Sequence, residues 1–96
     1  MTAYIMVEVD VHDAENFERY RGMVPATLEP YGGRYRVRGG ETVSLEGDWN
    51  PPRFVMLEFA SMGRAQAWHA SAEYREARTL RHQTAHSRMI AVDGVD

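Results

Sequence analysis

The chain contains no cysteine, and this absence excludes several kinds of chemistry at once. Disulfide bonds, thiolate nucleophiles, cysteine-ligated zinc and iron–sulfur clusters all require that residue. Long apolar runs are missing too, because no segment approaches the roughly 20 apolar residues that cross a bilayer. The opening residues lack the basic stretch and apolar run of a signal peptide. We therefore expect a cytoplasmic protein with no membrane partner.

An excess of positive charge is also missing. The 96 residues carry a formal net charge of −3, whereas surfaces that bind nucleic acid are generally basic, so we expect no nucleic-acid partner. With 44% hydrophobic and 26% charged residues, the composition is that of an ordinary globular chain. A chain of this length forms a single domain, here residues 1–96, and buries only about two-thirds of its unfolded surface. A large dimer interface would therefore help to stabilise it.

Periodicity along the chain predicts the element order βαββαβ. Alternation of β-branched and other residues indicates strands, and apolar residues at helical spacing indicate helices. The strands of this order are expected over 3–11, 34–38, 53–60 and 87–94, with a short additional strand over 41–47 that continues the ribbon after 34–38. The helices are expected over 13–31 and, as a helix pair, over 61–69 and 72–84. This order is typical of an α+β, ferredoxin-like fold, with an antiparallel sheet covered by helices on one face.

Several single residues mark where these elements begin, bend and end. Asp13 and Ser71 are candidate N-caps, because their side-chain oxygens can accept from free helical amides. Pro25 interrupts the first helical pattern and has no amide proton, which predicts a kink or break near Met23. Gly32 is expected to end that helix.

Residues 31–40, YGGRYRVRGG, combine two glycine pairs with three arginines. The stretch lacks the Gly-Lys-Ser/Thr of a P-loop, and no helix follows it as the dinucleotide fingerprint requires. We therefore expect no bound nucleotide or other cofactor. The glycines instead predict a turn on each side of a strand. Strict alternation would place Arg34, Arg36 and Arg38 on one face of that strand.

The sheet is predicted to have two apolar faces of different character. One face carries aliphatic residues such as Ile5, Val7 and Leu57 and is expected to pack against the helices. The other face mixes tyrosine, methionine and phenylalanine with charged residues, which is unusual for a face open to water. Two such faces packed together would form an isologous dimer with a barrel-like core. We therefore expect a homodimer.

Three stretches resemble the DUF1330 family of small proteins: YGGRYRVRGG, LEGDW followed by PPR, and LEFASM followed by AQAWHASAEY. The similarity covers about residues 3–95. It implies a ferredoxin-like protomer and a homodimer of the dimeric α/β-barrel superfamily. It implies no particular activity, because the family is one of unknown function. The wider superfamily includes cofactor-independent monooxygenases, lactone isomerases, haem-binding enzymes and ligand-binding regulatory modules.

Charged residues on the mixed face are the first candidates for a site. Glu58 is expected to lie across from the arginines, where a carboxylate and a guanidinium can form a bidentate pair. This pair either stabilises the hairpin or dimer, or Arg38 and Glu58 contact an anionic ligand. Glu8 is expected on the same face as Glu58. Two carboxylates in a partly dry cleft can do acid–base work, unless an arginine neutralises each.

Aromatic residues near the second and third helices are the other candidates. In the monooxygenases that the chain resembles, a tryptophan and a tyrosine line the pocket between helices and sheet. Trp68 and Tyr74 match this pair, either as core residues or as the wall of a pocket for a flat ligand. Arg81 is expected to add a polar contact. Those monooxygenases also use an asparagine, and here Asn50 lies in a proline-rich loop.

Histidines give no metal site in this interpretation. His82 and His86 are four residues apart, but their helix should end near Thr84 and no carboxylate completes the set. His69 could act as a general base beside the pocket or be a solvated surface residue.

Two functional hypotheses follow from these residues. In the first, a small anionic or aromatic ligand binds in a cleft between the sheet and the helices, with Arg38, Glu58, Trp68, Tyr74 and Arg81 as its contacts. The protein would then be a binding protein, or a cofactor-independent enzyme acting on a small carbonyl or aromatic acid. In the second, the protein is a non-catalytic dimeric module with a structural or regulatory role.

Overall fold

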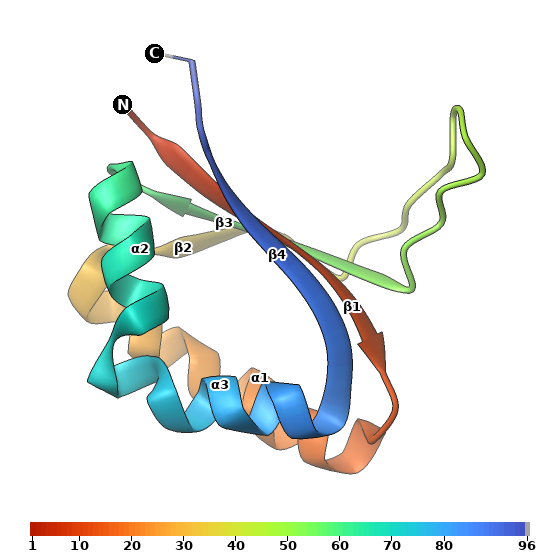
Figure 1. Cartoon of the computed structure of the whole chain (residues 1–96), viewed down its shortest axis with the longest axis horizontal. Coiled ribbons are helices and arrows are strands. Elements are labelled where there is room, and N and C mark those ends of the chain that lie inside the picture. The colour runs from red at the N-terminus through yellow and green to blue at the C-terminus, as the bar shows by residue number, and fades with distance from the viewer. Residues whose placement is uncertain (96) are drawn as a thin grey trace.

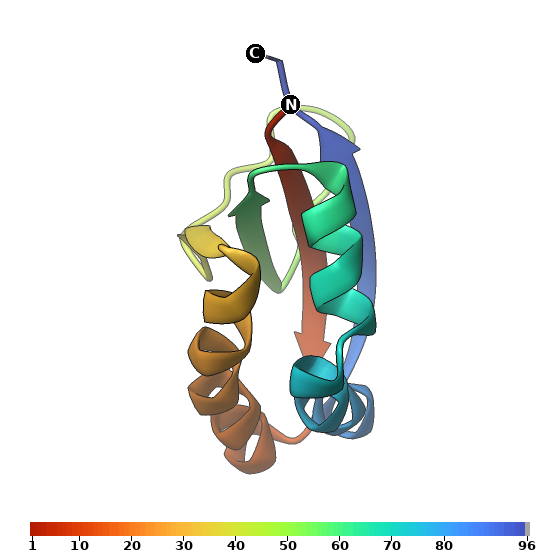
Figure 2. The same ribbon diagram turned by 90° about the vertical axis from the view of Figure 1, so that its left-hand side faces the viewer.

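Helices cover one face of a four-stranded antiparallel sheet in the computed structural model, which describes residues 1–95 (Figure 1). The elements are β1 (Ala3–Val11), α1 (Ala14–Leu28), the short 3-10 helix η1 (Glu29–Tyr31), β2 (Arg34–Arg38), β3 (Arg53–Phe59), α2 (Met62–Ala70), α3 (Ala72–Thr84) and β4 (Ala85–Asp93). The strands are ordered β2-β3-β1-β4. Figure 2 shows the helices in front of the sheet, on one side only. The predicted α+β, ferredoxin-like architecture is confirmed.

The core lies between the sheet and the helices. Alternate residues of β1 are buried there, among them Ile5, Val7 and Val9, as the period of two predicts. Phe17 from α1 and Trp68 from α2 meet them from the helical side. The opposite face of the sheet carries no helix, so it is open in the single chain (Figure 2). No helix in the described part of the chain is long and apolar enough to cross a membrane.

Side-chain caps begin each α-helix. Asp13 accepts a hydrogen bond from the Asn16 amide, and Ser71 accepts one from the Tyr74 amide, as predicted. Ser61 caps α2 in the same way. The expected break near Met23 is wrong, since α1 continues through Pro25 to Leu28. A proline inside a helix removes one hydrogen bond and frees the carbonyl four residues earlier, which here belongs to Arg21.

The predicted strand over 41–47 is wrong. Residues 40–52 form an irregular segment that projects away from the body of the protein (Figure 1). The strand β2 pairs with β3 and not with residues 41–47. At the end of this ladder the Gly39 amide donates to the Phe54 carbonyl. The other edge of β2 is the edge of the sheet, and the segment after Gly40 leaves it instead of turning back to pair there. Trp49 returns to the sheet, where its indole Nε1 donates to Glu8.

Two glycines should respond in opposite ways to alanine. A Cβ on Gly33 would lie 2.6 Å from the Phe59 ring and 2.8 Å from Leu28, so Gly33→Ala forces the core to shift. Overpacking of this kind destabilises a protein by about 1–3 kcal/mol. Gly22 lies within α1 with nothing near the added atom, so Gly22→Ala should stabilise the fold by up to about 1 kcal/mol. Urea denaturation of both variants measures the difference, and equal midpoints would contradict this packing.

Candidate functional site

A β-bulge in β2 decides which arginines face the helices. The register between β2 and β3 shifts by one residue between Tyr35 and Val37, so Arg36 is an extra residue on the bulged strand. Side chains alternate along a strand, so one extra residue moves all those after it to the other face. Arg38 therefore shares the helix-facing side with Tyr35. The expectation that Arg34, Arg36 and Arg38 lie on one face is wrong for Arg38.

A cavity of about 30 Å³ lies between the sheet and the helices at this point. Its inner walls are apolar and aromatic, and include Val9, Phe17, Tyr20, Val24, Trp68 and Met89. Three arginines also line it, Arg21, Arg38 and Arg53, and they lie close enough together for their charges to interact. No aspartate or glutamate lines it. The cavity therefore has an apolar end and a strongly basic end.

Hydrogen bonding and stacking hold Arg38 beside the cavity. Its guanidinium lies over the Tyr35 ring, 4.4 Å from the centroid, as a cation–π contact. Its Nη2 donates to the Arg21 carbonyl oxygen at 3.1 Å. That carbonyl is the acceptor that Pro25 leaves without its helical partner. The proline in α1 thus creates the acceptor that Arg38 uses.

Arg53 and Arg21 carry more positive charge than their neighbours neutralise. The Arg53 guanidinium lies 5.8 Å from the Phe17 ring centroid and forms no ion pair with a described residue. Burial, and then the charges of Arg21 and Arg38, lower the pKa of Arg53. Arg21 pairs with Glu18 at 2.6 Å, on the solvent side of α1. The Nε atoms of Arg21 and Arg53 are both buried without a hydrogen-bond partner.

Trp68 forms the inner wall of the cavity and is only 1% exposed. Its indole Nε1 donates to the Thr27 hydroxyl at 3.0 Å, which fixes the ring. The Tyr74 ring stacks behind it, with centroids 4.0 Å apart. Tyr74 is fully buried, and burial is the main cause that raises the pKa of its hydroxyl.

Arg81 lies behind Tyr74 and is also buried, with 4% of its surface exposed. Its Nη1 donates to the Tyr74 hydroxyl at 2.9 Å, and its Nη2 lies 3.0 Å from His82 Nε2. The Tyr74 hydroxyl is in turn 2.8 Å from that of Tyr20, which lines the cavity. Arg38 and Trp68 therefore line the cavity directly, while Tyr74 and Arg81 connect to it through Tyr20.

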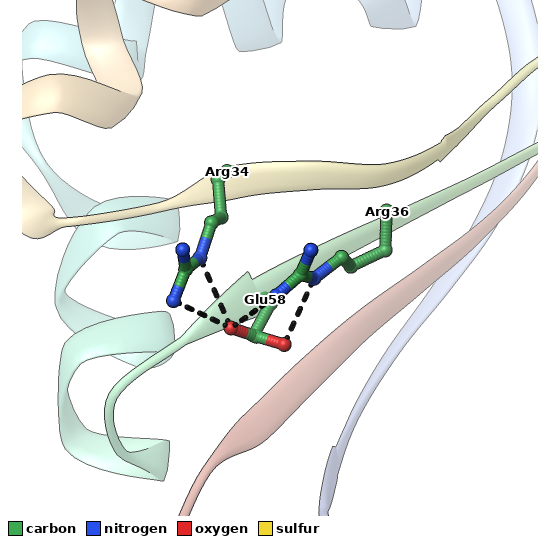
Figure 3. A network of polar contacts seen from close by, with 3 residues as sticks. All are labelled: Arg34, Arg36 and Glu58. Carbon is green, nitrogen blue, oxygen red and sulfur yellow. Dashed lines mark hydrogen bonds and ion pairs between the residues drawn. The ribbon is translucent and has the colours of Figure 1, made fainter.

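Glu58 lies on the opposite face of the sheet (Figure 3). Arg34 Nε donates to it at 3.0 Å, and Arg36 donates from Nε at 3.0 Å and from Nη2 at 3.3 Å. These contacts, above all the Arg36 hydrogen bond, lower the pKa of Glu58. On the bulged strand, Arg34 and Arg36 therefore bind Glu58 on the outer face, and Arg38 lines the cavity on the inner face.

Glu8 shares the outer face with Glu58, as the sequence predicts, but the two carboxylates do not form a pair. Glu58 is opposite Tyr4 in the register, four residues from Glu8 along β1, or about 13 Å. Arg88 donates to Glu8 at 2.7 Å, and with Trp49 it lowers the pKa of Glu8, the Trp49 hydrogen bond having the larger effect. Both carboxylates are therefore neutralised by arginine.

Histidines lie outside the cavity. His69 borders a separate surface hollow, and burial, then the charges of Arg78 and Arg81, lower its pKa. His86 extends from β4, where its ring is 5.0 Å from that of His12. Within residues 1–95, no three histidine, aspartate or glutamate side chains are grouped so as to hold a metal ion.

The sequence interpretation missed Arg21, Arg53 and Tyr20 as cavity residues. A signal for Arg53 was present, since it precedes Val55 by two residues and so shares the helix-facing side of β3. Tyr20 belongs to the apolar stripe of α1. Arg21 could have been noticed because it stands four residues before Pro25.

The fold and the cavity define a class, the ferredoxin-like α+β proteins that carry a hollow between sheet and helices. Within this class the chain belongs to the DUF1330 family, whose model is described as a domain of unknown function and matches residues 2–95. Among curated proteins, none matches this sequence.

Solved structures share the fold at low sequence identity. RPA0582, a protein of unknown function from Rhodopseudomonas palustris, is 23% identical, with a TM-score of 0.75 over 99% of this chain and 83% of that one. SnoaB, a cofactor-independent oxygenase from Streptomyces nogalater, is 11% identical, with a TM-score of 0.64 over 99% and 94%. A dimeric ferredoxin-like protein of unknown function from Jannaschia sp. CCS1 is 11% identical, with a TM-score of 0.67 over 98% and 100%.

The ion pairs of Glu58 predict a specific dependence of stability on pH. Its folded-state pKa lies below the ordinary value of 4.5, so its contribution is complete above that value and is lost as pH falls through the folded-state pKa. Glu58→Gln should therefore be less stable than the wild type at pH 7. The difference should shrink between about pH 5 and pH 3.

Urea denaturation across this range measures the effect. Glu41→Gln is the matched control, because Glu41 lies in the irregular segment and forms no ion pair with a described residue. A stability difference for Glu58→Gln that stays constant from pH 7 to pH 3 would be inconsistent with the ion pairs.

Proposed function

We propose that this protein binds a small carboxylic acid with an apolar body in the cavity between the sheet and the helices. The observation that carries the proposal is the composition of the walls, which are apolar at one end and carry three arginines and no carboxylate at the other. An apolar body would contact the valines and Trp68, and the carboxylate would contact the guanidinium groups. Arginine suits this role because its planar fork binds a carboxylate through two hydrogen bonds.

Unsatisfied donors support an anionic ligand. Burying a polar group without a hydrogen bond costs about 1–3 kcal/mol, and Arg21 and Arg53 each have a buried Nε in that state. Clustering of Arg21, Arg38 and Arg53 is also unfavourable, since like charges repel. A bound carboxylate would accept hydrogen bonds from these arginines and would also reduce the repulsion between them.

Movement of Arg38 would admit such a ligand. A volume of about 30 Å³ holds no more than two or three water molecules, so the cavity must expand around an organic acid. Arg38 is an exposed residue held by one cation–π contact and one hydrogen bond. Rotation of this long side chain would open the basic end and leave the core intact.

Among the five expected ligand contacts, we retain Arg38 and Trp68 as direct contacts. Tyr74 and Arg81 would act from behind the cavity wall, and Glu58 is assigned to the ion pairs of the outer face. If the bound acid is a substrate, the reaction would be proton transfer on, or oxidation of, a small carbonyl or aromatic acid without a cofactor. The likeness in fold to a cofactor-independent oxygenase motivates this reaction class.

We further propose that the outer face of the sheet pairs with a second copy of the chain. Its carboxylates, Glu8 and Glu58, are already paired with arginines of the same chain, and apolar side chains lie between them. The apolar side chains of this face include Met6, Met56 and Ile90, and Ile90 is 62% exposed. Two solved structures of the same fold are described as dimeric, and a surface with apolar side chains between ion pairs suits an isologous contact.

This apolar outer face also favours the second candidate function, a non-catalytic dimeric module with a structural or regulatory role. Under that alternative the arginines only stabilise the fold, and the cavity has no ligand. The two candidates differ in whether a small acid stabilises the protein.

Phenylacetate and its uncharged amide, phenylacetamide, test the binding proposal. Phenylacetate should raise the melting temperature of the wild type in proportion to the logarithm of its concentration, because it binds only the folded state. Phenylacetamide should have little effect, since it lacks the charge. Arg38→Gln should weaken phenylacetate binding at least tenfold in isothermal titration calorimetry, as expected for loss of a charge-assisted hydrogen bond.

Arg34→Gln is the matched control, because it makes the same change on the same strand but on the outer face. Its affinity for phenylacetate should equal that of the wild type. If the two variants bind equally well, or if acid and amide stabilise the wild type alike, the arginines are not the ligand site.

Dimer formation is tested by Ile90→Asp. A charge placed on the apolar outer face would be buried in the interface, so the variant should sediment as a monomer where the wild type sediments as a dimer. Gln83→Asp, on the exposed side of α3, should leave the dimer intact. The sedimentation test uses 100 µM protein. A wild type that is monomeric at this concentration would overturn the proposed interface.

A further inference from the structure

A chain of hydrogen bonds links a buried arginine to the cavity. Arg81 Nη1 lies 2.9 Å from the Tyr74 hydroxyl, and the Tyr74 hydroxyl lies 2.8 Å from that of Tyr20. Arg81 and Tyr74 come from α3, whereas Tyr20 comes from α1 and lines the cavity. The chain therefore crosses from one helix to the other and ends at the cavity wall.

The first member of this chain fixes one of its two hydrogen bonds. An arginine has only donors, so the Tyr74 oxygen must accept from it. The bond between the two hydroxyls allows either donor, but Tyr74 is fully buried and has no other acceptor among the described residues, so donation from Tyr74 to Tyr20 is the direction that leaves no buried proton without a partner. The Tyr20 oxygen then accepts, and its own proton remains available. Burial raises the pKa of Tyr74, which keeps it protonated as this arrangement requires.

No described residue takes the proton of Tyr20. Its hydroxyl has one hydrogen-bond partner, Tyr74, and in the direction argued above its oxygen is the acceptor of that bond. The Phe17 and Tyr74 rings cover Tyr20 on two sides, with centroids 5.2 and 6.4 Å away. The free donor is thus left for water or for a ligand in the cavity.

Arg81 makes this donor stronger than an isolated tyrosine would be. It is almost fully buried, forms no ion pair with a described residue, and its Nε has no hydrogen-bond partner. Hydrogen bonds in series polarise one another in a dry interior, so the buried positive charge strengthens each hydrogen bond along the chain. An uncompensated buried charge is costly, and a negative ligand oxygen at the far end of the chain would reduce that cost.

We infer that the Tyr20 hydroxyl donates a hydrogen bond to a carbonyl or enolate oxygen of the bound acid, and that the ligand class is the 2-oxo acids. This inference rests on the proposed function, since the carboxylate of the same ligand is taken to bind the arginines. Tyr20 and Arg21 are consecutive and line the same cavity. A second oxygen next to the carboxylate therefore suits the pair. Arg81 and Tyr74 are positioning residues, which orient and polarise the donor.

Phenylglyoxylate and phenylacetate provide the test, because they differ only in a ketone oxygen in place of two hydrogens. Wild-type protein should bind phenylglyoxylate about tenfold more tightly in isothermal titration calorimetry, the value of one hydrogen bond in a dry site. Tyr20→Phe should reduce this ratio to about one. Tyr31→Phe is the matched control, since the Tyr31 hydroxyl bonds Glu73 outside the cavity, and it should keep the ratio.

Arg81→Met tests the chain itself with both hydroxyls left in place. It should lower the preference for phenylglyoxylate severalfold, whereas an arginine that serves only the fold would leave the preference unchanged. Equal binding of the two acids by the wild type would overturn the inference and leave the proposed function standing. Failure of both acids to bind would overturn the proposed function and this inference with it.

Discussion

The placement of charge in this protein depends on one extra residue in β2. Without the bulge at Arg36, strict alternation would place Arg38 on the outer face beside Arg34, and the cavity would lose one of its three arginines. With the bulge, the five-residue strand β2 places Arg34 and Arg36 on the outer face and Arg38 on the inner face. A bulge interrupts the ladder and has an energetic cost, but β2 lies at the edge of the sheet, where such an interruption is tolerated.

A second local irregularity, Pro25 in α1, fits the first. The proline removes the amide that would have bonded the Arg21 carbonyl, and the side chain of Arg38 donates to that oxygen instead. The bulged strand therefore supplies a donor to the carbonyl that the proline leaves free in the helix. Because Arg21 itself lines the cavity, its carbonyl and its side chain both belong to the basic end. Two departures from regular structure meet at the same place, which is typical of a site rather than of a packing core.

Most of the fold could be predicted from the sequence because it depends on local periodicity. Alternation identified β1, and the caps at Asp13 and Ser71 located two helices. The strand expected over 41–47 was wrong because strand pairing is decided by the whole sheet: β2 pairs with β3 on one edge, and residues 41–47 leave its other edge unpaired. The site was harder to predict for a related reason. The bulge reverses the side-chain direction after Arg36, and nothing in the alternating pattern RYRVR shows where an extra residue is inserted.

The two faces of the sheet use arginine in opposite ways, and this contrast is the strongest argument about function. All 11 basic residues of the chain are arginines, so every positive side chain here has the same planar geometry. On the outer face Arg34 and Arg36 share Glu58, and Arg88 pairs with Glu8. Between the sheet and the helices, Arg38, Arg53 and the buried Arg81 form no ion pair with a described residue, whereas Arg21 pairs with Glu18. The total charge is negative, so carboxylates are not scarce, yet none lines the cavity. The arginines around the cavity therefore carry more positive charge than the chain neutralises, and this is the feature that our proposal of a negative ligand accounts for.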